Sequence, residues 1–220
     1  MDRPFSRERF EEVPVVGILR NFSRSQVEMI AERYAAAGFT TLEITLNSPE
    51  ALPTISSLVK KFGDRLNIGA GTVCTKKDLD RALDAGACFV VTPILDKAVI
   101  KSCVKKKIPV FPGAYTPTEI YKAWSLGAAT VKVFPATGLG PGYIREVLAP
   151  LNKLALLAVG GVSTGNVGAW LSAGAKGVGM GSHLFPREFI EAGRWDELGD
   201  FFSGFAKTIR DYRETIHFSS

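Results

Sequence analysis

The chain has 220 residues, of which 46% are hydrophobic, and this size and composition suit a domain with a sizeable core. Its formal net charge of +5 is modest, which argues against a nucleic-acid-binding protein, and no stretch approaches the roughly 18 apolar residues of a membrane span. Three cysteines without paired spacing and two histidines predict neither a disulfide framework nor a metal site. We therefore expect a cytoplasmic protein that needs no metal and no cofactor.

Short apolar segments typical of strands alternate with helical patterns along the chain. The predicted strands are Val15–Leu19, Thr41–Leu46, Asn67–Ala70, Phe89–Thr92, Ile108–Phe111, Thr130–Phe134, Ala155–Val159 and Gly177–Met180. The predicted helices are Ser25–Ala37, Pro49–Phe62, Lys76–Ala85, Lys97–Lys106, Pro117–Ser125, Gly142–Ala149 and Thr164–Ala173, followed by a C-terminal helix. Strand-helix alternation indicates a parallel sheet, and eight units at this length predict an α/β fold, a (β/α)8 TIM barrel.

We expect one domain over residues 1–220, because no linker or low-complexity tract interrupts the pattern. Residues 1–12 are charged and without an apolar core, so they are predicted to form an N-terminal extension. Residues 194–220 are predicted to form the C-terminal helix and tail.

Lys132 is unusual because it lies inside the strand-like run AATVKVFPA. Side chains alternate along a strand, so Val131 and Val133 share one face while Lys132 and Phe134 share the other. Burial lowers the pKa of a lysine, and an unprotonated amine attacks carbonyl groups. The alternative is a lysine at a strand end whose amine reaches into water.

Glu43 repeats this pattern with the opposite charge. In TTLEITLNSP, Leu42 and Ile44 lie on one face and Glu43 lies on the other. In a parallel sheet that helices cover, both strand faces are hidden, so a charged residue needs a partner or a function. A buried ion pair that only holds the barrel together is the structural alternative.

A TIM barrel gathers its chemical groups where the strands end and the following loops begin. Several polar or pocket-forming residues fall at or near predicted strand ends: Arg20, Glu43, Thr72, Thr92, Pro112 and Lys132. A lysine, a glutamate and an arginine from separate strands that face one opening form a reactive constellation.

Two glycine-rich segments, AVGGVS and GVGMGSHLF, follow or enter the last two predicted strands. In TIM barrels the loops after strands seven and eight commonly bind a phosphate through backbone N–H groups, and glycine permits its close approach. The candidates are Gly160, Gly161, Gly181 and Ser182. The sequence therefore predicts a phosphorylated or acidic substrate.

The runs GILR, LEITLNSP, GAGTV, FVVTP, FPGAYTPTE, VKVFPA, AVGGV and GMGS resemble those of the bacterial 2-keto-3-deoxy-6-phosphogluconate aldolase family, which includes 4-hydroxy-2-oxoglutarate aldolase activity. The resemblance covers roughly Val13 to Phe185, in order and at compatible spacing. ILR, LNSP and GPGYIREV resemble the 2-keto-3-deoxy-6-phosphogalactonate branch more closely.

This resemblance implies a homotrimeric aldolase that acts on a small 2-keto acid without a cofactor. Lys132 matches the Schiff-base lysine and Glu43 the acid/base, while Thr72 matches a residue near the pyruvyl carboxylate. Gly161 and Ser182 belong to the segments associated with the substrate phosphate. Pro93, Pro112 and Phe134 would form the pocket wall.

The chain departs from the gluconate-type pattern at Asn47, where those enzymes usually carry an arginine. Arg20, at the end of the first strand, can supply the missing positive charge, as in the galactonate-like branch.

Two other functions are compatible with the glycine-rich loops. One is an isomerase or synthase of the phosphate-binding barrels, which would not need Lys132. The other is a non-catalytic barrel that binds a sugar phosphate. The apolar residues Trp170, Phe201 and Phe205 would serve either subunit contacts or core packing.

Overall fold

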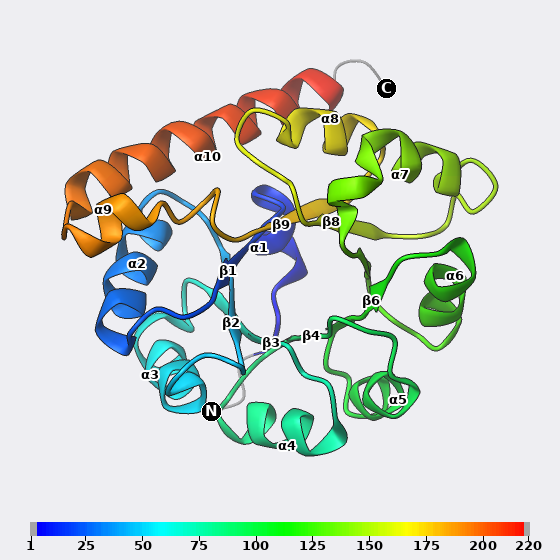
Figure 1. Ribbon diagram of the computed structural model, residues 1–220, viewed down its shortest axis with the longest axis horizontal. Coiled ribbons are helices and arrows are strands. Elements are labelled where there is room, and N and C mark those ends of the chain that lie inside the picture. The colour runs from blue at the N-terminus through cyan, green and yellow to red at the C-terminus, as the bar shows by residue number, and fades with distance from the viewer. Residues whose placement is uncertain (1–3, 218–220) are drawn as a thin grey trace.

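The computed structural model describes residues 4–217. Among these residues, the strands form one parallel sheet in the order β5-β4-β3-β2-β1-β9-β8-β7-β6. Their bounds are β1 Val15–Leu19, β2 Thr41–Thr45, β3 Asn67–Gly71, β4 Val90–Val91, β5 Val110–Phe111, β6 Gly113–Ala114, β7 Val131–Val133, β8 Leu156–Val159 and β9 Gly177–Met180. In Figure 1 the strands form a central ring that helices surround, so the predicted TIM barrel is confirmed.

The seven predicted helices and the C-terminal helix occur in the predicted order, and a 3-10 turn after β7 and a short helix after β9 were not predicted. Their bounds are α2 Arg24–Ala36, α3 Ala51–Phe62, α4 Lys76–Asp84, α5 Lys97–Lys105, α6 Pro117–Ser125, α7 Gly140–Leu148, α8 Val167–Ser172, α9 Arg187–Glu191 and α10 Trp195–His217, with a 3-10 turn η1 at Ala136–Gly138. Helices α2, α4 and α6 begin at capping boxes on Ser23, Thr75 and Thr116, which satisfy backbone N–H groups at each start.

The fifth strand of the barrel is split in two at Pro112. The sequence predicted one strand that ends at Phe111, which was wrong: β5 pairs with β4, and β6 pairs with β7 on the other side. Proline has no N–H group to continue the ladder, but its carbonyl oxygen accepts a hydrogen bond from the Lys132 N–H at 2.9 Å. β5 and β6 are the two ends of the sheet, so the ring closes where the chain itself joins them, at residues 110–114.

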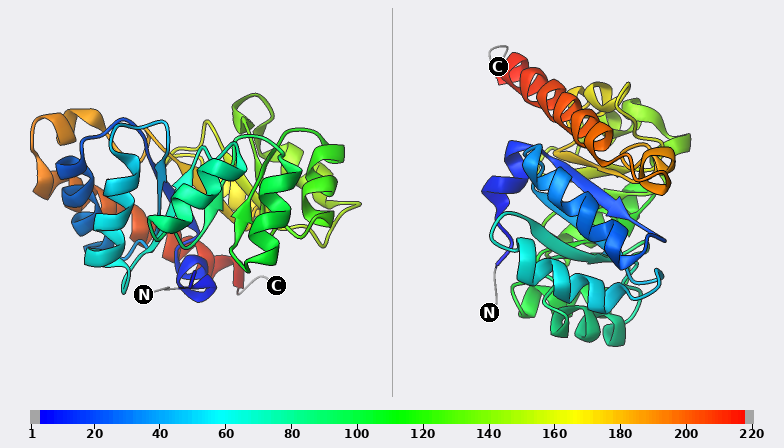
Figure 2. Two further views of the ribbon diagram at one scale, coloured as in Figure 1. Left: turned by 90° about the horizontal axis from the view of Figure 1, so that it is seen from below. Right: turned by 90° about the vertical axis from the view of Figure 1, so that its left-hand side faces the viewer.

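The predicted N-terminal extension contains a helix and a buried side chain that its charged sequence did not suggest. Residues Arg7–Glu12 form helix α1, which buries Phe10. In Figure 2 (left) this helix lies below the strands, and in Figure 1 it lies across the centre of the ring. Since α1 directly precedes β1, it covers the end of the barrel where the strands begin.

Aromatic side chains join α1 to the interior of the barrel. The Phe5 ring lies 5.4 Å from the Phe89 ring and 5.9 Å from the Phe111 ring, centroid to centroid. Phe10 packs against the same group at 6.2 Å from Phe111. Asn67, the first residue of β3, holds the segment through hydrogen bonds with the backbone of Ser6. This end of the barrel is therefore filled, and the opposite end carries the loops.

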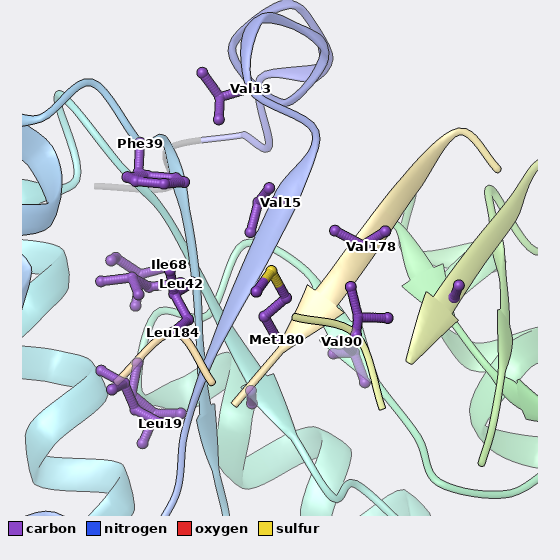
Figure 3. Close-up of a cluster of buried hydrophobic side chains, with 14 of the residues drawn as sticks. Val13, Val15, Leu19, Phe39, Leu42, Ile68, Val90, Val178, Met180 and Leu184 are labelled. Atoms are coloured by element: carbon purple, nitrogen blue, oxygen red, sulfur yellow. The ribbon is translucent and has the colours of Figure 1, made fainter. Parts of the chain in front are cut away.

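Alternation along the strands separates two apolar clusters. The larger cluster lies between strands and helices, and Figure 3 shows Leu19, Leu42 and Phe39 on the helix side of β1 and β2. The smaller cluster fills the barrel and includes Phe10, Val16, Phe89, Val91, Phe111, Leu157 and Val159. Both faces of these strands are hidden from water, as expected for a parallel sheet.

Gly69 in β3 provides a test of this interior packing. A methyl group added at Gly69 would overlap the buried Phe89 ring, so Gly69→Ala should lower the free energy of unfolding by about 1–3 kcal/mol, the usual cost of overpacking. Urea denaturation measures this difference. Gly142→Ala is the matched control, because nothing lies within 4 Å of a methyl group added there, and helix α7 should be as stable or slightly more stable. Wild-type stability of Gly69→Ala would contradict the proposed packing.

Candidate active site

Lys132 points into the barrel. Its neighbours Val131 and Val133 belong to the helix-side cluster, so alternation turns Lys132 to the interior. The side chain is 6% exposed, and its Nζ atom lies 4.5 Å from the centre of the Phe134 ring. In the sheet, Lys132 is opposite Gly113 on one side and Leu157 on the other. The structure thus places an amine in apolar surroundings.

Glu43 enters the same interior from β2. It is 2% exposed and stands opposite Ile18 of β1 and Gly69 of β3. The carboxylate lies over Gly71, because a methyl group added at Gly71 would overlap Oε1 of Glu43. Sequence reasoning predicted Glu43 but missed the role of Gly71. The alternating glycines of NIGAG were a signal that a neighbouring strand carries a large inward side chain.

Lys132 and Glu43 shift each other's pKa. Burial lowers the pKa of Lys132, and the charge of Arg20 lowers it further, while the Glu43 carboxylate raises it. Burial raises the pKa of Glu43, while Lys132 and Arg20 lower it. Among the side chains that the structure describes, residues 4–212, neither group has a hydrogen bond or an ion pair with another side chain. Titratable groups in a barrel interior that shift each other's pKa in this way are typical of a site that acts on a bound molecule.

Arg20 and Thr72 lie at the carboxyl ends of β1 and β3. Arg20 is exposed and directly follows Leu19, and its charge reaches both Lys132 and Glu43. Thr72 directly follows Gly71 and has a φ of 58°. This left-handed backbone is unfavourable for a β-branched residue, and such strain clusters at functional sites. The structure therefore brings both predicted residues to the opening that Lys132 and Glu43 face.

Two of the three predicted wall residues contact Lys132, and the third lies against the neighbouring strand β6. Phe134 contacts the amine, and Pro112 binds the Lys132 backbone. Pro93 lies against Gly113, since a methyl group added there would overlap the Pro93 carbonyl group. Their contribution to a pocket remains a prediction, but their positions agree with it.

The glycine-rich loops lie side by side at the same opening, because β8 and β9 are paired. Gly160 and Gly161 have φ angles of 104° and 72°, which favour glycine. Asn166 donates a hydrogen bond from Nδ2 to the Gly161 carbonyl oxygen at 2.9 Å and so fixes the loop. Gly181 and the exposed Ser182 follow β9. The structure brings together the four residues predicted to bind phosphate.

Other sequence predictions concern the outside of the barrel. Trp170 and Phe205 are buried and Phe201 is partly buried against the same core, which favours core packing over subunit contacts. In the described part of the chain, no three His, Cys, Asp or Glu side chains gather closely enough to hold a metal ion. No helix among these residues is long and apolar enough to cross a membrane.

The fold and the polar groups at its opening define a class: a single-domain TIM-barrel enzyme. The family model for KDPG and KHG aldolases, the aldolases of 2-keto-3-deoxy-6-phosphogluconate and 4-hydroxy-2-oxoglutarate, matches residues 7–201. The chain belongs to this family, and it is a lyase.

Individual relatives agree with this assignment. The chain is 37% identical to the 2-dehydro-3-deoxy-6-phosphogalactonate aldolase of Escherichia coli over 79% of this chain and 85% of that protein. A structure described as native KDPGal matches with a TM-score of 0.85 at 32% identity, covering 96% of this chain and 99% of the other. A KDPG aldolase from Legionella pneumophila, with pyruvate captured as a covalent carbinolamine, matches with a TM-score of 0.83 at 26% identity, covering 90% and 96%.

The pKa shifts predict how the reactivity of Lys132 depends on pH. Only the neutral amine is nucleophilic, so its acetylation by acetic anhydride should rise with pH and level off at a lower pH than for an ordinary lysine, whose pKa is 10.5. Glu43→Gln removes a negative charge that favours the ammonium form, so the midpoint should move to still lower pH. Mass spectrometry of the Lys132 peptide measures both midpoints.

Glu146→Gln is the control, because Glu146 is exposed on α7, outside the barrel, and the midpoint should not move. A midpoint for Glu43→Gln at higher pH than in the wild type would contradict the electrostatic assignment.

Proposed function

We propose that the protein is a class I aldolase that cleaves a 2-keto-3-deoxy-6-phospho sugar acid of the gluconate or galactonate type to pyruvate and glyceraldehyde 3-phosphate. As a second reaction it would cleave 4-hydroxy-2-oxoglutarate to pyruvate and glyoxylate. The observation that carries this proposal is the buried Lys132 amine, which shares the barrel interior with Glu43 and faces the opening where the loops meet.

Lys132 would begin the reaction. Its neutral Nζ atom attacks the C2 carbonyl carbon of the substrate, and loss of water from the carbinolamine gives an iminium ion. The positive nitrogen then withdraws electrons from the C3–C4 bond. Burial favours this step because it raises the neutral fraction of the amine near neutral pH.

Glu43 would move the protons. Its carboxylate accepts the proton of the C4 hydroxyl, directly or through one water, while the C3–C4 bond breaks and the aldehyde leaves. The electron pair of the broken bond gives an enamine on Lys132. Protonation at C3 and addition of water then release pyruvate and the free amine. The raised pKa of Glu43 suits a group that takes up and returns a proton.

Arg20 and Thr72 would bind the carboxylate of the substrate. Arginine binds carboxylates with two parallel hydrogen bonds, and Arg20 is placed where its charge acts on both reactive groups. In this role Arg20 replaces the arginine that gluconate-type enzymes carry at the position of Asn47. Asn47 is exposed in the loop after β2.

Gly160, Gly161, Gly181 and Ser182 would bind the substrate phosphate at the ends of β8 and β9. Gly160 and Gly161, whose positive φ angles favour glycine, carry no side chain that would hinder an anion from approaching their N–H groups. The ILR and LNSP motifs, together with a relative at 37% identity that is named for the galactonate substrate, favour the galactonate type.

We also infer a cytoplasmic homotrimer. Cys74, Cys88 and Cys103 are free thiols, which is typical of a reducing compartment. The trimer follows from the family resemblance, and the large exposed side chains Val104 and Tyr121 are apolar surface that subunit contacts would cover.

The proposal predicts a covalent adduct on one residue. Incubation with pyruvate and borohydride should reduce the Schiff base to a stable product on Lys132, because no other described lysine is buried in the barrel. Lys132→Ala should lose both the adduct and turnover. Peptide mass spectrometry locates the adduct, and an adduct on another lysine would refute the assignment.

Glu43→Gln separates the two catalytic roles. It should still form the adduct but slow cleavage by about 100- to 10,000-fold, the usual contribution of a positioned acid/base. Unchanged turnover would leave Glu43 with a structural role only.

The substrate type can be tested by measuring pyruvate release from a panel. The panel holds the phosphogluconate and phosphogalactonate substrates, their unphosphorylated forms and 4-hydroxy-2-oxoglutarate. We expect the highest kcat/KM with the phosphogalactonate substrate and a loss of about 10-fold or more without phosphate, since hydrogen bonds to a charged group contribute about 1.5–3 kcal/mol each. Equal rates with and without phosphate would contradict the role of the glycine-rich loops.

A further inference from the structure

Two hydroxyl groups, those of Ser48 and Thr45, form hydrogen bonds with the backbone on either side of Arg20. The Asn21 N–H donates to Ser48 Oγ at 3.0 Å, and Thr45 Oγ1 donates to the Leu19 carbonyl oxygen at 3.4 Å. The two hydroxyls lie 2.9 Å apart. Since the Thr45 proton is engaged by Leu19, Ser48 donates to Thr45. The hydrogen bonds therefore run in one direction from the residue after Arg20 to the residue before it.

The backbone beside Arg20 needs this support. Asn21 has a φ of 59°, a left-handed conformation that turns the chain sharply at the end of β1. On the far side of the turn, Arg187 of α9 lies 5.0 Å from the Phe22 ring and donates to the Asn21 carbonyl oxygen at 3.5 Å. The turn is thus held between the β2–α3 loop and α9, and it sets the direction in which Arg20 leaves the barrel wall.

Arg20 itself has no comparable anchor on its side chain. It is exposed, and no ion pair within the described residues fixes its guanidinium group. A long flexible side chain loses about 1.5–2 kcal/mol of rotamer freedom when it is ordered, so a fixed backbone is the remaining means to aim it. Ser48 is partly buried and belongs to LNSP, the motif in which Asn47 replaces an arginine.

We propose that Ser48, acting through Thr45, is a positioning residue that aims Arg20 at the carboxylate of the substrate. This inference rests on the carboxylate-binding role proposed for Arg20. It explains why ILR and LNSP occur together in this chain: the loop after β2 carries no arginine of its own, and instead it fixes the backbone of the arginine that follows β1.

The test compares steady-state kinetics with the preferred phosphorylated substrate. Ser48→Ala should raise KM about 3- to 10-fold with little change in kcat, because a neutral hydrogen bond is lost while Lys132 and Glu43 stay in place. Ser48→Thr keeps the hydroxyl and should restore most of the wild-type KM. Ser56→Ala is the matched control: Ser56 donates one hydrogen bond to the Ala85 carbonyl oxygen from the helix that follows the same loop, and KM should not change.

A double-mutant cycle separates positioning from general stability. Ser48→Ala should have no further effect on KM in an Arg20→Ala background, since the residue that it aims is gone. Thr45→Val breaks the same chain of hydroxyls and should show the same dependence on Arg20, so it replaces Ser48→Ala if that variant does not fold.

The outcomes distinguish this inference from the proposed function. If Arg20→Ala leaves KM unchanged, the carboxylate role of Arg20 is wrong and the positioning role fails with it. If Arg20→Ala raises KM while Ser48→Ala does not, or if the effects of the two substitutions multiply in full, Arg20 keeps its role and the positioning by Ser48 is overturned.

Discussion

The burial of one amine in an apolar interior is the constraint on which the rest of this structure depends. An ammonium ion loses its hydration inside the barrel, so burial lowers the pKa of Lys132 and increases the fraction of the neutral amine. The Glu43 carboxylate opposes this effect because it stabilises the charged amine. The two groups are not joined by a direct ion pair in the described chain, and Arg20 further biases Lys132 toward the neutral form. The site therefore keeps an amine reactive and a carboxylate able to exchange protons.

Glycines in the barrel interior make room for large side chains, and an aromatic cluster excludes water from one end of the barrel. Gly71 leaves space for the Glu43 carboxylate and Gly69 leaves space for the Phe89 ring. Helix α1 and the aromatic cluster fill the end where the strands begin, so access is limited to the loop end. At that end the left-handed residues Asn21 and Thr72 turn the chain beside the reactive groups. At Asn21 the strain is offset by the hydrogen bonds with Ser48 and Arg187.

The split fifth strand links the architecture to the chemistry. Pro112 ends one ladder and its carbonyl binds the Lys132 backbone, so closure of the ring and placement of the lysine depend on the same short segment. Thr92 contributes to this junction, because its hydroxyl accepts a hydrogen bond from the Gly113 N–H at 3.3 Å. A barrel closed in this way holds the strand that carries the amine in fixed register with its neighbours.

The sequence by itself determined the order of the predicted strands and helices, the barrel, and that Lys132 and Glu43 lie on the strand face opposite to their apolar neighbours, because alternation along a strand is a local property. Helix α1 was missed because it buries only one side chain, Phe10, whose packing partners come from distant strands, and β6 was missed because its pairing needs β7. Only the tertiary structure decided that Gly71 lies under Glu43 and that Ser48 supports the turn beside Arg20. Those contacts join residues from different strands and loops, whose distances depend on how the ring closes.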